Sequence, residues 1–205
     1  MKSIFSILLI IFILQSCKDK DCEPIATQPS IKLVSTAGSY WLYDWYSIDT
    51  LGNEKFLRTD STYIAGDTII NGNNYLIKKG NGFNNNRVNY LRDSIGFVVN
   101  VEGDILWNKN SIGIIRTTNE SEINLEWSMT SLSSNIMVPA GTFSTIERTT
   151  KACYNNGQPL TPCDTCQEEQ AYFSEGLGVV FERTAYIGIF NCSYLEGRLR
   201  KYVIL

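Results

Sequence analysis

The sequence predicts an all-β protein, an antiparallel meander of roughly nine to twelve short strands that curves into a barrel or half-barrel. A β-sandwich is the alternative architecture. From Tyr40 onward, short apolar and aromatic runs are separated by Gly and Asn, which is typical of strands and turns. Apolar and polar residues alternate strictly over residues 123–130. No capped apolar pattern of helical period follows, and because parallel strands need long crossovers, we expect antiparallel pairing.

Each predicted strand is a short apolar run bounded by turn residues. The segment 123–130 is the clearest, because successive side chains of a strand point to opposite faces and its four apolar residues fall on one face. The other predicted strands cover residues 40–48, 62–65, 68–70, 75–78, 89–92, 97–101, 104–107, 135–138, 142–150, 170–174, 179–187 and 193–204. The predicted turns are Asn71-Gly72, Glu102-Gly103, Pro139-Ala140-Gly141 and residues 175–178.

The first 16 residues have the features of a secretory signal peptide. An apolar run over residues 4–14 follows the basic Lys2. At roughly 1.5 Å per helical residue, it covers about half of a ~30 Å hydrocarbon core, so it is too short to span a membrane. A basic start, a short apolar core and the small residue Ser16 before the expected cut predict a signal peptide over residues 1–16.

The residues at the expected cut, Leu14-Gln15-Ser16-Cys17, resemble the lipobox of bacterial lipoproteins. The resemblance implies that the Cys17 thiol carries a diacylglycerol and that the mature chain begins there. Acyl chains such as palmitate on Cys17 would hold the protein on a membrane, since each buried CH₂ contributes roughly 0.8 kcal/mol. The alternative is an ordinary signal peptide followed by a chance cysteine.

The stretch after the anchor, Lys18-Asp19-Lys20-Asp21, resembles the charged segment of surface-displayed lipoproteins of the Bacteroidota. The resemblance implies an outer-membrane lipoprotein that faces the cell surface rather than the periplasm; a plain solvated tether is the alternative. Residues 17–35 contain two prolines and no periodicity, so we expect a lipidated cysteine and a flexible tether there, with a single β domain over residues 36–205.

Four cysteines form the most specific side-chain set of the predicted β domain: Cys153, Cys163, Cys166 and Cys192. The predicted meander brings them to one end of the sheet, and outside the cytosol such cysteines normally form disulfides, here two, with the pairing left open. A zinc site and a redox-active pair at Cys163 and Cys166 are the alternatives. Cys22 is then the odd thiol, open to intermolecular pairing.

A second candidate site is the aromatic run at residues 40–46. On a strand, Trp41, Tyr43 and Trp45 share one face. They are a candidate stacking platform for a ligand, and the alternative is that they pack in the core.

The chain contains no histidine and has a formal net charge of −3. The first fact excludes nucleophile systems that depend on histidine. The second makes the chain a poor binder of polyanions, so we expect no nucleic-acid partner. We expect no cofactor and no metal.

Four sequence blocks, "GDTIINGNNYLI", "NYLRDSIGFVVNVEGDILWN", "VPAGTF" and "YFSEGLGVV", resemble the layout of uncharacterised exported proteins of the Bacteroidota. The resemblance implies an exported all-β module and brings no catalytic residues with it. The leading functional hypothesis is therefore a non-enzymatic binding or accessory module, whose partners are the membrane, through its lipid anchor, and an envelope protein or a small ligand. The alternatives are a carboxylate hydrolase that works without histidine and a carrier of an apolar ligand.

Overall fold

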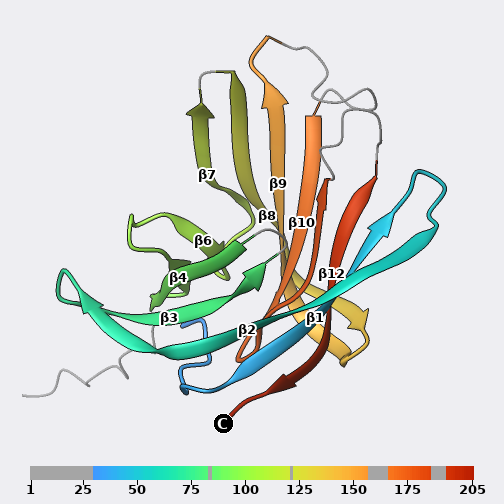
Figure 1. Cartoon of the computed structure of the whole chain (residues 1–205). Coiled ribbons are helices and arrows are strands. Elements are labelled where there is room, and N and C mark those ends of the chain that lie inside the picture. Colours follow the sequence, from blue (N-terminus) through green and yellow to red (C-terminus); the bar gives the residue numbers. More distant parts are fainter. Residues whose placement is uncertain (1–29, 83–84, 121, 157–165, 186–192) are drawn as a thin grey trace, which may run out of the picture.

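The computed structural model describes residues 30–82, 85–120, 122–156, 166–185 and 193–205, and in these residues it forms one twelve-stranded antiparallel sheet that closes almost completely into a barrel (Figure 1). The predicted all-β class and meander are confirmed, and the barrel is the architecture adopted rather than the sandwich. The strands are β1 (Tyr40–Ile48), β2 (Glu54–Ile70), β3 (Asn73–Gly82), β4 (Asn85–Ser94), β5 (Phe97–Val99), β6 (Ile105–Asn108), β7 (Gly113–Glu120), β8 (Ile123–Val138), β9 (Gly141–Tyr154), β10 (Cys166–Ser174), β11 (Gly178–Ala185) and β12 (Tyr194–Val203).

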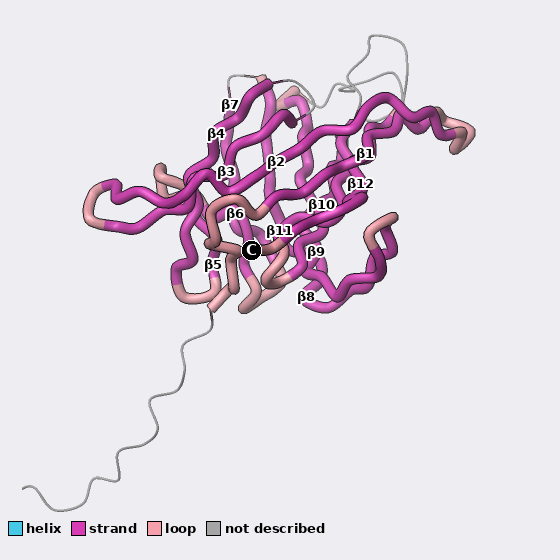
Figure 2. Tube along the Cα trace, turned by 60° about the horizontal axis from the view of Figure 1, so that its bottom comes forward, coloured by secondary structure: helices cyan, strands magenta, loops and turns pink. Residues whose placement is uncertain are grey.

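Nearly every strand pairs with its neighbours in the chain. The order in the sheet is β6-β5-β4-β3-β2-β1-β12-β11-β10-β9-β8-β7, so the first strand pairs with the last. The two edges, β6 and β7, therefore come from the middle of the sequence. Both views show hairpins β1–β2, β2–β3 and β8–β9 extending beyond the barrel wall (Figure 1; Figure 2).

Several strands are longer than the sequence predicted. Strand β2 has 17 residues and unites the predicted strands 62–65 and 68–70, because Gly66 lies at a register shift rather than in a turn. Strand β8, with 16 residues, unites 123–130 and 135–138 across two register shifts. Irregularities of this kind bend a strand and keep it in its sheet, which curves the wall of a barrel.

The predicted turns connect strands as expected. Asn71 and Gly72 have φ values of 51° and 77° between the paired residues Ile70 and Asn73. Two positive φ values in a two-residue loop are those of a type I′ turn, which matches the twist of the flanking strands. One strand was missed: β7 has few buried side chains and lacks the alternation that marks β8.

The packed domain begins earlier than residue 36, the boundary expected from the sequence. Ile31 is 1% exposed and packs in a cluster with Val98 and Met129. The main chain nearby is also held, because the amide of Gly176 donates to the carbonyl oxygen of Lys32 at 2.8 Å. Part of the segment expected to be tether is therefore part of the fold.

Side chains of β7 and β9 contact β6 and the turn before it, across the gap between the two edges of the sheet. The Nη1 of Arg148, on β9, donates to the carbonyl oxygen of Leu106, on β6, at 2.9 Å, and its guanidinium lies 4.6 Å from the ring centre of Trp107. Arg116, on β7, forms an ion pair of 3.0 Å with Asp104, just before β6.

No helix among the described residues is long and apolar enough to cross a membrane.

Candidate ligand cavity inside the barrel

The barrel contains a partly open cavity of about 300 Å³, a size within the usual range of small-molecule sites. Strands β1 to β6, β10 and β11 all contribute to its lining, and Leu33 and Val34 from the N-terminal segment line it too. Most of the lining is apolar. Its apolar side chains include Trp41, Trp45, Leu76, Leu91, Trp107 and Phe173.

The aromatic residues that the sequence singled out form one wall of this cavity. Trp41, Tyr43 and Trp45 share the inner face of β1 and are 2%, 6% and 4% exposed. They therefore do not form a platform on the outer surface; they are core residues that also face the interior space. The alternation of β1 explains this, since its other face carries Asp44.

The phenol of Tyr43 is a fixed part of the wall. Its hydroxyl donates to the carbonyl oxygen of Val179 at 2.7 Å, which joins β1 to β11. Burial raises the pKa of Tyr43 far above its usual range, and Glu182 raises it further. The group therefore remains a neutral hydrogen-bond donor.

Five charged residues lie among the apolar side chains of the lining: Asp60, Lys78, Lys79, Arg87 and Glu182. Lys78, on β3, has its Nζ 5.1 Å from the ring centre of Trp41, in the position of a cation–π contact. Burial lowers the pKa of Lys78, and the charge of Glu182 opposes this shift. Glu182, on β11, has its pKa raised by burial, while Lys78 and Arg148 act in the opposite direction.

These two charges interact but are not in contact. Neither Lys78 nor Glu182 has a hydrogen bond or an ion pair with another residue that the structure describes. In the sheet, β2, β1 and β12 lie between their strands, so the two side chains approach each other across the interior rather than along the wall. Both residues line the space that a ligand would occupy.

Another charged residue on the cavity wall is already paired. Asp60, on β2, lies 3.0 Å from the Nη2 of Arg58 on the same strand. Its carboxylate is therefore neutralised by a neighbour, unlike that of Glu182. Among the described residues, no group of three or more histidines, cysteines, aspartates or glutamates is arranged to hold a metal.

Sequence reasoning missed Lys78 and Glu182, although a signal was present. Each stands two residues after a side chain that faces inward, Leu76 in one case and Val180 in the other. Because strand side chains alternate between faces, extending the apolar pattern by one step would have placed both charges inside.

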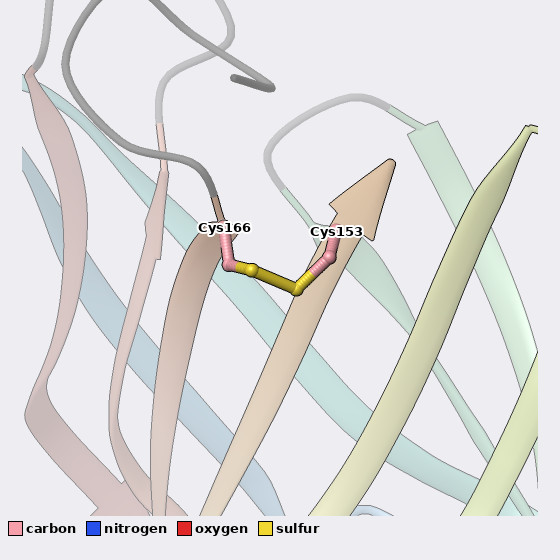
Figure 3. Close-up of a disulfide and its surroundings, with 2 residues drawn as sticks. All are labelled: Cys153 and Cys166. Carbon is pink, nitrogen blue, oxygen red and sulfur yellow. A yellow bond between two sulfur atoms is a disulfide. The ribbon is translucent and has the colours of Figure 1, made fainter. Parts of the chain in front are cut away.

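Of the predicted cysteine cluster, the structure describes one disulfide, between Cys153 at the end of β9 and Cys166 at the start of β10 (Figure 3). The two residues are direct partners in the β9–β10 ladder, so the bond links neighbouring strands. Cys163 and Cys192, the other two candidates, lie outside the described residues, as do Cys17 and Cys22.

No protein-family model and no curated protein matches this sequence. Solved structures do resemble it. A protein from Bacteroides fragilis, described as exported and as having a YmcC-like fold, is similar with a TM-score of 0.51 at 10% identity, over 85% of this chain and 99% of its own. A protein from Parabacteroides distasonis described as a lipoprotein gives a TM-score of 0.44 at 12% identity, over the same shares of the two chains. The predicted resemblance to exported Bacteroidota proteins is thus confirmed at the level of the fold.

Proposed function

We propose that this protein is a lipid-anchored lipoprotein of the bacterial outer membrane, displayed at the cell surface, whose barrel binds a small, largely apolar ligand. The observation that carries the proposal is the cavity of about 300 Å³ walled by Trp41, Trp45 and Trp107. Aromatic and aliphatic walls with a few polar groups are the usual composition of small-molecule sites. The carrier considered from the sequence is therefore the function with most support.

The lipobox resemblance supports the membrane anchor, and the fold shared with an exported protein is consistent with an envelope location. We expect Cys17→Ala to release the protein from the membrane fraction of the producing cells. Cys22→Ala is the matched control, because it removes a nearby thiol outside the lipobox. Retention of the Cys17→Ala protein in the membrane would contradict the anchor.

The hydrolase alternative has less support. Two facing carboxylates would be needed for acid–base work without histidine. Of the two acidic residues that line the cavity, Asp60 is paired with Arg58, and Glu182 faces a lysine. Among the described residues, the cavity lining therefore offers one unpaired carboxylate rather than a catalytic pair.

Ligand binding can be tested with a neutral dye and an aliphatic competitor. We expect N-phenylnaphthylamine to become fluorescent with the protein and octanol to displace it. Leu76→Trp should remove dye binding, because Leu76 lines the cavity and a larger side chain would fill it. Ile69→Trp is the control, since Ile69 is 75% exposed on the same hairpin. Dye binding that survives in the folded Leu76→Trp variant would show that the cavity is not the site.

A further inference from the structure

We propose that the bound ligand carries a polar group that lies between Lys78 and Glu182, accepts a hydrogen bond from one and donates to the other, as a primary amide does. This inference rests on the proposed function, because it names the chemistry of the ligand that the barrel holds. It comes from two charges on facing walls of one cavity.

The first step is the placement of the charges. Lys78 and Glu182 come from β3 and β11, line the same cavity and interact electrostatically, yet no ion pair joins them in the described residues. Inside an apolar cavity, a charged group without a hydrogen-bond partner is costly. A group that fits between the two side chains would satisfy both.

The second step concerns which group fits. A carboxylate would pair with Lys78 and be repelled by Glu182, and an ammonium would do the reverse, since charges interact strongly in a medium of low dielectric constant. A primary amide avoids both repulsions. Its carbonyl oxygen accepts from the lysine, and its N–H groups donate to the carboxylate.

Other charges surround this pair, and Lys79 and Arg87 add positive charge to the same lining. Arg87, Arg148 and Glu169 also act on Glu182, and Arg148 is already bound to the carbonyl oxygen of Leu106. Of these three, only Arg87 lines the cavity. The remainder of the ligand would contact the apolar wall, so the ligand class is a small apolar molecule with an amide head.

The test uses four probes with the same alkyl chain: octanamide, octanol, octanoate and octylamine. Each displaces N-phenylnaphthylamine from the full mature protein, and the dissociation constants are compared. We expect octanamide to bind about tenfold more tightly than octanoate or octylamine, since hydrogen bonds to charged groups are worth about one factor of ten or more. Octanol is the uncharged reference with a single hydroxyl as its polar group.

Two variants then probe the two walls separately. In Glu182→Gln the repulsion of a carboxylate is removed, so the preference for octanoate over octylamine should rise about tenfold. In Lys78→Gln the same preference should fall by a similar factor. Thermal unfolding curves establish that each variant is folded. If Lys78→Gln does not fold, Lys78→Met replaces it.

The outcomes separate this inference from the proposed function. Tightest binding of octanamide, with opposite shifts in the two variants, supports the amide site. If octanol binds but octanoate binds more tightly than octanamide, or if both variants shift the preference in the same direction, the amide site is wrong and the carrier stands. If none of the four probes displaces the dye, the carrier itself fails.

Discussion

A glycine makes room for one residue of the cavity wall. Gly197, on β12, lies directly opposite Trp45, on β1, and a Cβ at this glycine would be 2.9 Å from Cη2 of the indole. Real Cβ atoms do not approach a ring so closely, so either the ring or the strand must move. The aromatic side chain therefore depends on the absence of a side chain on the neighbouring strand.

We expect Gly197→Ala to lower the free energy of unfolding by about 1–3 kcal/mol, the usual cost of overpacking a core. Urea unfolding followed by circular dichroism measures this change. The Trp45→Phe background is the control, because a smaller ring leaves space for the methyl group. An equal cost in both backgrounds would mean that contact with Trp45 is not the cause.

At the scale of elements, two hairpins have the same turn but different residues in it. Asn71-Gly72 joins β2 to β3, and Ile95-Gly96 joins β4 to β5, with φ values of 51° and 54° at the first position. Asparagine tolerates this left-handed conformation, whereas a β-branched side chain is strained in it. The second hairpin therefore has an unfavourable residue at its turn.

Exchanging the residue types at the two turns tests this explanation. We expect Ile95→Asn to raise the free energy of unfolding by about 1 kcal/mol and Asn71→Ile to lower it by a similar amount. Burial changes little, because Ile95 is 54% exposed and Asn71 is also exposed. Urea unfolding of both variants gives the two signs. Changes in the same direction would exclude backbone strain as the reason.

The predictability of the elements follows from how much of each strand is buried. Strand β1 was predicted with its exact limits, because aromatic residues at alternate positions mark a buried face. The prediction divided β2 at Gly66, because glycine occurs both in turns and in bulges and the sequence alone does not distinguish the two. Strand β7 was not predicted because it is an edge strand with little buried surface.

At the scale of the whole molecule, the meander could be predicted but its closure could not. The local alternation of side chains and the turn residues predict that consecutive strands pair with each other in the sheet. The pairing of β1 with β12 and the contact of Arg148 with Leu106 join residues that are distant in the sequence. The alternation within each strand could have placed Lys78 and Glu182 inside, but that the two line one cavity depends on the curvature of the sheet.

The interior charges also affect the stability of the whole barrel. Burial of charged groups that lack an ion pair or a hydrogen bond lowers stability, and natural sites retain such groups when they serve binding. Glu182 has its pKa raised by burial, so its ionised form destabilises the fold. Glu54 is the opposite case, because its hydrogen bond with Arg198 lowers its pKa and its ionised form is stabilising.

The two glutamates therefore predict pH dependences of opposite sign. We expect Glu182→Gln to raise the free energy of unfolding at neutral pH. This gain should shrink as the pH falls through the raised pKa of Glu182 and vanish below the ordinary glutamate pKa of about 4.3, where the carboxyl is neutral in both states. Glu54→Gln should instead lower the free energy of unfolding at neutral pH, and this loss should disappear only as the pH falls through the lowered pKa of Glu54.

Urea unfolding of both variants and the natural sequence, from neutral to acid pH, measures these differences. Comparison at each pH cancels the titration of all other groups, so the difference belongs to the substituted residue. If the gain of Glu182→Gln persisted unchanged in acid, it would come from packing rather than from the charge. In that case the charge of Glu182 would not be what lowers the stability of the fold, and the charge pattern on which the amide site depends would be wrong.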